Sequence, residues 1–93
     1  MRMLNKRELA IYLELRRKFG YLPFNIGDAL SHMRPYFSPK VVLSVLRYLI
    51  KSGLVSEIDN FTFKLNDLED YLFIDVVYPY LLRKASLRRR SQR

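Results

Sequence analysis

The chain has 93 residues, of which 49% are hydrophobic and 14% aromatic, enough for one small domain with a hydrophobic core. Its formal net charge is +8, from 17 Lys and Arg against 9 Asp and Glu, which indicates an anionic partner: nucleic acid or a membrane surface. Cysteine is absent and histidine occurs once, which excludes disulfides, thiolate chemistry and an ordinary structural zinc site. We therefore expect no metal and no cofactor.

The N-terminal sequence MRMLNKREL carries charges where a signal peptide needs its apolar run, and no apolar stretch reaches 18 residues. These features predict an intracellular, cytoplasmic protein. The absence of cysteine and the single glutamine are also typical of proteins from thermophiles.

A capped helix is predicted near the N-terminus. Asn5 and Glu8 have the spacing of a capping box, and apolar residues follow at helical intervals. Gly20 is a typical C-terminal stop, so we expect a helix from about residue 6 to 19.

A short connector and a second helix follow. Residues 21–24 are too few, and too close to Pro23, for a central strand, and they suit a connector or a brief edge strand. Asn25 then precedes apolar residues spaced at i, i+3, i+4 and i+7, which predicts an amphipathic helix. Pro35 ends that helix near Arg34.

The third predicted helix has two chemically different sides. Ser38-Pro39 is an N-cap with proline at the first helical position, and Gly53 fits the position after the C-terminus. The apolar stripe consists of Val42, Leu43, Leu46, Leu49 and Ile50. The opposite side consists of Lys40, Ser44, Arg47 and Lys51, flanked by Val41 and Tyr48.

A β-hairpin is predicted after this helix. Residues 61–65 alternate apolar and polar side chains, and they follow a similar short run at 54–58. Asp59-Asn60 is suited to a two-residue turn between the two strands.

A last helix is expected from about residue 67 to 82. Asn66 or Asp67 caps it, and its first turn is acidic, as the helix dipole favours. The text from residue 71 onward, YLFIDVVYPYLL, is apolar on nearly every side, and Pro79 should kink or restart the helix.

This order of elements resembles that of a winged helix-turn-helix domain. The resemblance is carried by residues 25–67, NIGDALSHMRPYFSPKVVLSVLRYLIKSGLVSEIDNFTFKLND, and most clearly by VLRYLIKSGLVSE. The chain is similar to small transcription regulators of the PadR and MarR kinds, and to compact regulators of archaea and their viruses. The expected fold class is mainly α with a small β-hairpin (α+β), a winged helix with an added C-terminal helix over residues 1–82. A basic tail, 83–93, follows.

The resemblance implies that the third helix lies in the major groove of DNA. Composition supports this independently, because no acidic residue occurs between Asp28 and Glu57. DNA carries one negative charge per roughly 1.7 Å of axis and would repel a carboxylate on a reading surface. The candidate DNA-binding residues in this region are Arg34, Ser38, Lys40, Val41, Ser44, Arg47, Tyr48 and Lys51.

The hairpin departs from the family pattern at its tip. Glu57, Asp59 and Asn60 stand where a wing that contacts DNA carries basic residues, so we expect no wing–DNA contact. The tail is expected to supply phosphate contacts instead, as an arm or as an extension of the last helix; a disordered solubilising tail is the alternative. The candidate tail residues are Arg83, Lys84, Arg88, Arg89 and Arg90.

The apolar last helix indicates self-association, since one helix on a small domain cannot bury all its sides. Regulators of the similar families pair through terminal helices. Asp75 is then expected in an interface ion pair or hydrogen bond. The candidate interface residues are Tyr71, Phe73, Ile74, Val77, Tyr78 and Leu81.

Taken together, the sequence predicts a homodimeric protein that binds double-stranded DNA and regulates transcription. Two alternatives stay open: an architectural DNA binder without sequence preference, and a winged-helix protein–protein interaction module in a larger assembly. No catalytic residues are expected, because the chain has neither a Gly-rich phosphate loop nor a nucleophile motif. His32 is interpreted as a surface histidine.

Overall fold

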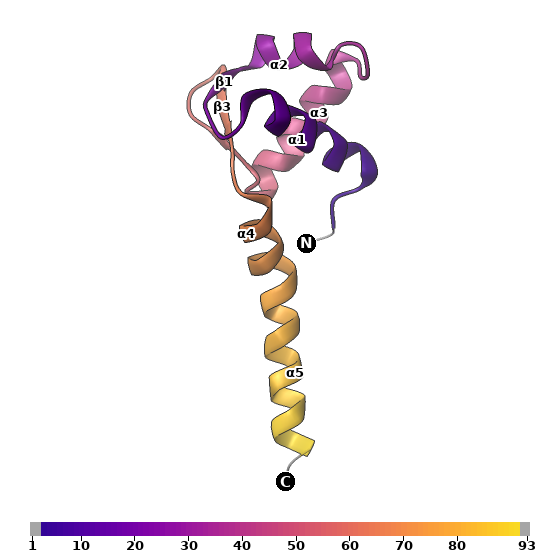
Figure 1. The fold of residues 1–93 in the computed structure, drawn as a ribbon, viewed down its shortest axis with the longest axis vertical. Coiled ribbons are helices and arrows are strands. Elements are labelled where there is room, and N and C mark those ends of the chain that lie inside the picture. The colour runs from indigo at the N-terminus through magenta and orange to yellow at the C-terminus, as the bar shows by residue number, and fades with distance from the viewer. Residues whose placement is uncertain (1–2, 92–93) are drawn as a thin grey trace.

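The computed structural model describes residues 3–91, and the side chains of residues 3–86. Helices dominate, and a small antiparallel sheet accompanies them, which confirms the predicted class of a mainly α protein with a small β element (Figure 1). The elements are α1 (Lys6–Phe19), β1 (Phe24–Asn25), α2 (Ile26–Met33), α3 (Pro39–Ser52), β2 (Val55–Glu57), β3 (Thr62–Leu65), α4 (Leu68–Leu72), the π-helix η1 (Phe73–Val77) and α5 (Tyr78–Ser91).

Local sequence signals fix the ends of the first three helices. At α1, the Asn5 side chain accepts a hydrogen bond from the Glu8 N–H at 2.8 Å, and the Glu8 carboxylate accepts from the Asn5 N–H at 2.9 Å. At α3, the Ser38 hydroxyl oxygen accepts from the Val41 N–H. Gly53 closes α3 with a φ of 91°, a left-handed conformation that glycine adopts without strain. The predicted helices are confirmed here.

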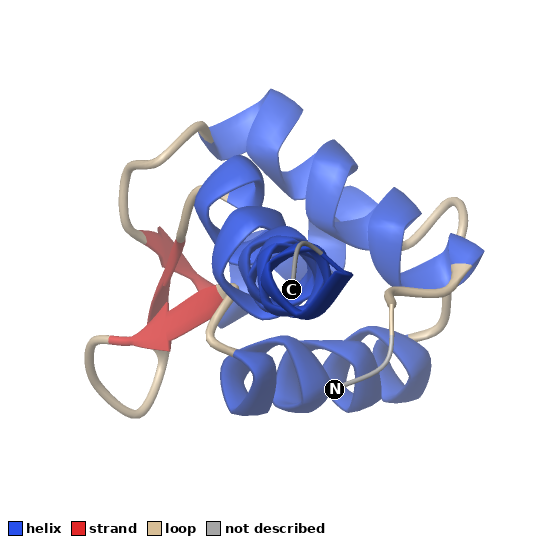
Figure 2. Ribbon diagram, turned by 90° about the horizontal axis from the view of Figure 1, so that it is seen from below, coloured by secondary structure: helices blue, strands red, loops and turns tan. Residues whose placement is uncertain are grey.

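The hydrophobic core lies between α1, α2, α3 and the sheet. The apolar side of α3 turns inward and contributes four buried residues, whereas Leu43 and Ile50 at the edges of that stripe are only partly covered. Figure 2 shows the sheet on one side of the helices. The fully buried side chains include Ile11, Tyr12, Leu15, Met33, Val42, Leu49, Leu54, Val55 and Leu65.

The sheet has the strand order β1-β3-β2, so β3 is central and β1 is the brief edge strand that was expected. The hairpin turn has three residues, so the prediction of a two-residue turn is wrong. The Ile58 N–H donates to the Thr62 carbonyl at 2.9 Å, which leaves residues 59–61 in the turn. The cause is the Asp59 carboxylate, which accepts from the Phe61 N–H at 2.9 Å and stabilises the longer turn.

The last helix differs from the expected segment in length and regularity. It continues beyond residue 82 through the basic segment to Ser91, so the chain has no break in its secondary structure where the domain was expected to end. A π-helix interrupts it directly before Pro79, and there the Tyr78 N–H donates to the Phe73 carbonyl, five residues back. Proline has no N–H, so a change of hydrogen-bond pattern at this point accommodates it.

Residues 68–91 form a stalk that extends away from a compact head, residues 3–67 (Figure 1). The molecule measures 59 × 23 × 20 Å along its principal axes. Only the first turn of the stalk packs on the head, through buried Tyr71 and the partly buried Leu68 and Leu72. No helix within residues 3–91 is long and apolar enough to span a membrane.

Candidate nucleic-acid interface

The outer side of α3 is an exposed polar surface, which we call the α3 face: Lys40, Ser44, Arg47 and Lys51. Their spacing places them on one side of the helix, and the buried stripe on the opposite side holds that surface toward solvent. From the first to the last residue the face is about 16 Å long at 1.5 Å per residue.

Two other predicted contact residues lie at the border of this face. Val41 and Tyr48 are half-buried and pack against the core, so their exposed parts flank the face. Ser38 is exposed, but its hydroxyl oxygen caps α3. Val41, Tyr48 and Ser38 therefore stabilise the fold in addition to any contact with a ligand.

The connection between α2 and α3 carries another predicted contact residue. Arg34 is exposed and ends α2. The N–H groups of Tyr36 and Phe37 both donate to the Met33 carbonyl, at 3.0 and 2.9 Å, which makes the turn compact. Phe37 anchors this turn against the core, whereas Tyr36 is 66% exposed.

A hydrogen-bond network links the other end of α3 to α1 and the hairpin. The Tyr12 hydroxyl donates to the Asn66 carbonyl at 2.5 Å, and burial raises the pKa of Tyr12 to about 12. The Asn66 amide donates to the Gly53 carbonyl at 2.8 Å and to the Ser56 hydroxyl at 2.9 Å. Sequence reasoning missed this link, which ties α1, α3 and the hairpin together. Of the two expected caps of the last helix, Asp67 is the one used.

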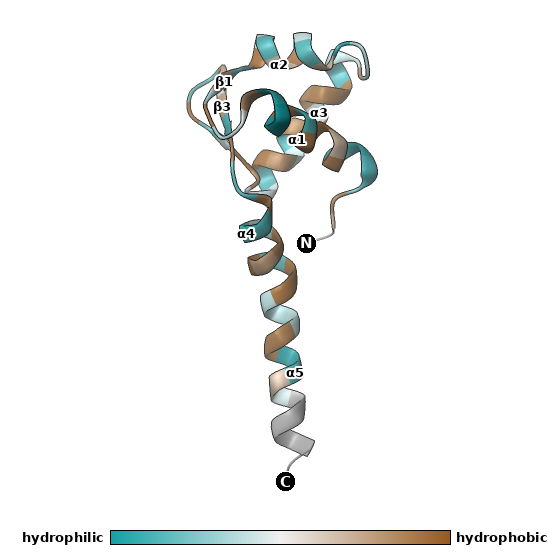
Figure 3. Cartoon of the chain, in the orientation of Figure 1, coloured by the Kyte–Doolittle hydropathy of each residue, from teal (hydrophilic) through white to brown (hydrophobic). Residues whose placement is uncertain are grey.

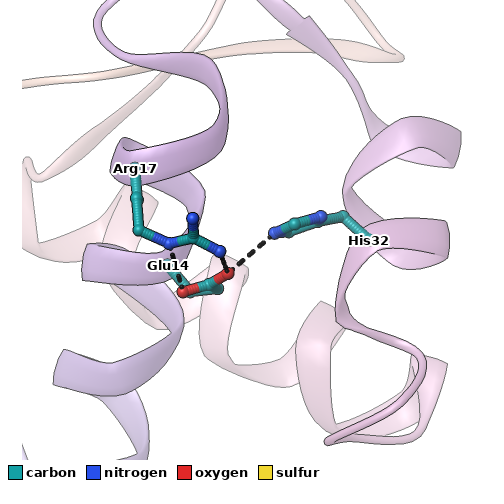
Figure 4. Close-up of polar contacts among 3 residues, drawn as sticks. All are labelled: Glu14, Arg17 and His32. Atoms are coloured by element: carbon teal, nitrogen blue, oxygen red, sulfur yellow. Dashed lines mark hydrogen bonds and ion pairs between the residues drawn. The ribbon is translucent and has the colours of Figure 1, made fainter.

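An ion cluster connects α1 to α2 (Figure 4). The Glu14 carboxylate lies 2.9 Å from His32 Nε2 and accepts hydrogen bonds from Arg17 Nη2 and Nε at 2.5 and 3.1 Å. The hydrogen bond from Arg17, followed by that from His32, lowers the pKa of Glu14 to about 2. His32 is half-buried in this cluster, so the interpretation as a simple surface histidine is incomplete.

The tip of the hairpin is acidic and apolar. Glu57 and Asp59 are exposed, and the hydrogen bond from the Phe61 N–H lowers the pKa of Asp59. Ile58 and Phe61 are also exposed, at 52% and 64%. This combination differs from the basic α3 face in both charge and polarity.

The basic end of the stalk lies apart from the α3 face within one chain (Figure 1). Arg83 and Lys84 are exposed on α5, and Lys84 Nζ lies 5.4 Å from the centre of the Tyr80 ring. The side chains of the remaining tail candidates lie outside the described residues: Arg88, Arg89 and Arg90. The structure therefore divides the predicted DNA-binding residues between the head and the far end of the stalk.

The predicted dimer residues are divided in a similar way. Tyr71 is buried in its own chain and is thus a core residue, which corrects its assignment to the interface. The other five are exposed along the stalk, where brown hydrophobic segments recur in Figure 3. These five residues are Phe73, Ile74, Val77, Tyr78 and Leu81.

An open hollow of about 380 Å³ lies where the stalk meets the head. Carboxylates of Asp67, Asp70 and Asp75 line it, together with Ser52 at the end of α3. The Ser52 hydroxyl donates to the Leu49 carbonyl at 3.0 Å. Within the described part of the chain, no group of three or more His, Cys, Asp or Glu residues is arranged to hold a metal ion.

Comparison of the chain with protein-family models, with curated proteins and with solved structures finds no match. Any functional assignment therefore depends on the geometry and chemistry of this chain. The two surfaces with the strongest chemical character are the basic α3 face and the exposed apolar stalk.

Proposed function

We propose that the protein is a winged helix-turn-helix transcription regulator that binds double-stranded DNA as a homodimer in the cytoplasm and reads the major groove with the α3 face. The order of elements in the head supports this proposal: α1, β1, α2, α3, then the β2–β3 hairpin. In this arrangement a short turn joins α2 to α3, and the hairpin follows directly, as the wing does in such domains.

The observation that carries the proposal is a basic, acid-free surface on a helix exposed along one side. Lys40, Arg47 and Lys51 are all exposed on α3, and no carboxylate occurs anywhere in residues 29–56. A major groove about 12 Å wide admits a helix of this kind. The absence of acidic side chains removes the repulsion that a phosphate backbone would otherwise exert.

Position along α3 suggests different roles for the three cations. Arg47 lies in the C-terminal half of the face, away from its ends, and is suited to donate two hydrogen bonds to a guanine edge. Lys40 and Lys51 lie at the two ends, where they would meet phosphates on either side of the groove. Ser44 lies between them and would contact a base edge or a phosphate.

The stalk supports the dimeric part of the proposal. Seven large apolar side chains stay exposed on its described part, and exposed apolar surface of this extent is typical of interaction sites. A two-fold dimer would bury the patch and would present two α3 faces, so the expected operator is an inverted repeat.

The direct test compares two exposed arginines. Arg47→Ala should lower affinity for the preferred duplex by about 1–3 kcal/mol and relax the preference at one base pair. Arg7→Ala, on the exposed side of α1, is the matched control and should leave binding within about twofold. Fluorescence anisotropy with the wild-type operator and single-base variants measures both. Equal, small effects of the two substitutions would contradict the proposal.

One observation favours a second candidate, a winged-helix module that binds another protein. The exposed Ile58 and Phe61 form a small apolar tip between carboxylates, which suits a protein better than DNA. For such a module Phe61→Ser would abolish partner binding and Arg47→Ala would not. An architectural DNA binder would instead show the same affinity for all duplexes and a steep salt dependence.

A further inference from the structure

The two ends of the stalk carry opposite charge. Residues 67–75 at its base contain four acidic side chains and no basic one: Asp67, Glu69, Asp70 and Asp75. Residues 83–90 contain five basic side chains and no acidic one: Arg83, Lys84, Arg88, Arg89 and Arg90. The intervening segment, 76–82, has no charged residue. The stalk is thus an apolar rod with a negative base and a positive end.

The π-helix places two exposed aromatic side chains of the rod on one side. In a regular α-helix, residues five apart point about 140° away from each other at 3.6 residues per turn. The π turn brings Phe73 and Tyr78 together, with ring centres 5.9 Å apart. Three further apolar residues of the rod, Ile74, Val77 and Leu81, are 64%, 39% and 50% exposed.

We infer that the partner covering this side is a second copy of the chain, with its stalk antiparallel to the first. This inference deepens the proposed dimer and rests on it. Parallel stalks would place four acidic residues against four, and five basic residues against five, which is destabilising. Antiparallel stalks place the acidic base of each copy against the basic end of the other, with the apolar segments between them.

The charge distribution also sets the register of the pair. The acidic residues centre near residue 70 and the basic residues near residue 87, so the two stalks cross close to Pro79. Phe73 of one copy then lies opposite residues 84–85 of the other. The two Leu68 residues, where the stalks leave the heads, are about 33 Å apart at 1.5 Å per residue. The heads lie at opposite ends of the pair.

The acidic hollow at the base of the stalk fits this arrangement. Asp67, Asp70 and Asp75 line it on the side of the stalk and Ser52 on the side of α3. In the antiparallel register, the basic end of the partner's α5 arrives at this level. The basic end is therefore assigned to the partner's base, and this replaces the phosphate contacts that the sequence suggested for it.

Disulfide cross-linking tests the orientation without interference, because the chain contains no cysteine. Three exposed positions are substituted singly: Phe73→Cys, Ala85→Cys and Tyr78→Cys. Phe73 and Ala85 are about 18 Å apart along one helix, well beyond the roughly 7 Å that a disulfide spans between Cα atoms. Tyr78 lies near the crossing point and reports dimer formation in either orientation.

Oxidation of a mixture of the Phe73→Cys and Ala85→Cys chains should give one mixed product. Neither chain alone should cross-link, whereas Tyr78→Cys should cross-link to itself. Efficient self-linking of Phe73→Cys and of Ala85→Cys, without the mixed product, would show parallel stalks and overturn the inference while leaving the dimer intact. Light scattering of the reduced proteins shows whether they form a dimer at all. A monomer at micromolar concentration would overturn both the antiparallel orientation and the proposed dimer.

Discussion

The head and the stalk differ in how far their large hydrophobic side chains are buried. In the head, Ile11, Leu46 and Leu49 are buried and contact residues from several elements. In the stalk, Phe73 and Ile74 are at least half exposed although they are as apolar as any core residue. Burial of each large apolar side chain stabilises a fold by about 1.5–3 kcal/mol, so the buried residues of the head contribute this stabilisation within one chain, whereas exposed stalk residues such as Phe73 and Ile74 do not.

The two regions also distribute charge differently. In the head, the α3 face carries three cations and no acidic residue, and Glu14 joins α1 to α2 through Arg17 and His32. The stalk instead separates acidic and basic residues along its length. The α3 face is therefore suited to a negative ligand, and the charge of the stalk to a copy of itself.

The largest expected effect contrasts a leucine of the head with a leucine of the stalk. Leu49→Ala should destabilise the head by about 2–5 kcal/mol, because Leu49 is fully buried and its loss leaves a cavity. Leu82→Ala should change the stability of the head by less than about 0.5 kcal/mol, because Leu82 is 53% exposed and lies outside the core of the head. Urea unfolding followed by circular dichroism measures both. Equal losses would show that the stalk is packed as tightly as the head.

A second substitution addresses the stalk alone. Tyr78→Asp should produce monomers and lower operator affinity about 100-fold, since the second head no longer binds in the same complex. Tyr80→Asp, two residues further on and thus on the other side of α5, should leave the dimer intact. Light scattering and anisotropy test the two variants. Monomers from Tyr80→Asp but not from Tyr78→Asp would move the interface to the opposite side.

The smallest expected effect concerns acid stability of the head. The pKa of Glu14 is about 2 in the folded protein against 4.5 ordinarily, so the ionised carboxylate stabilises the fold above pH 4.5. This stabilisation is lost as the pH falls from about 4.5 toward 2. Glu14→Gln should therefore be less stable than wild type at pH 7, and the difference should shrink below pH 4.5. Urea unfolding at a series of pH values measures it; a constant difference would contradict the ion cluster.

The sequence predicted those features whose signals are local. Asn5 with Glu8, and Ser38 with Pro39 and Gly53, define helix ends within a few residues, and the structure places α1 and α3 accordingly. The α3 face follows from periodicity alone, because its residues alternate with a stripe that must be buried.

Features that depend on distant residues could not be predicted in this way. Glu14 and His32 are 18 residues apart, and Tyr12 and Asn66 are 54 apart, so no spacing rule joins them. The three-residue turn was missed because the Asp59 side chain, rather than the backbone pattern, selects it. Tyr71 belongs to the same apolar run as its exposed neighbours, and only its packing against the head distinguishes it from them.

Selection of duplexes from a random pool by the wild-type protein tests most directly whether the α3 face reads DNA. We expect enrichment of an inverted repeat whose half-sites are separated by one helical turn of DNA or more. Affinity for the enriched duplex should fall steeply with salt, because Lys40, Arg47 and Lys51 would displace counterions from the phosphates on binding. A pool that stays random after repeated selection, or binding that is insensitive to salt, would contradict the proposed role of the α3 face.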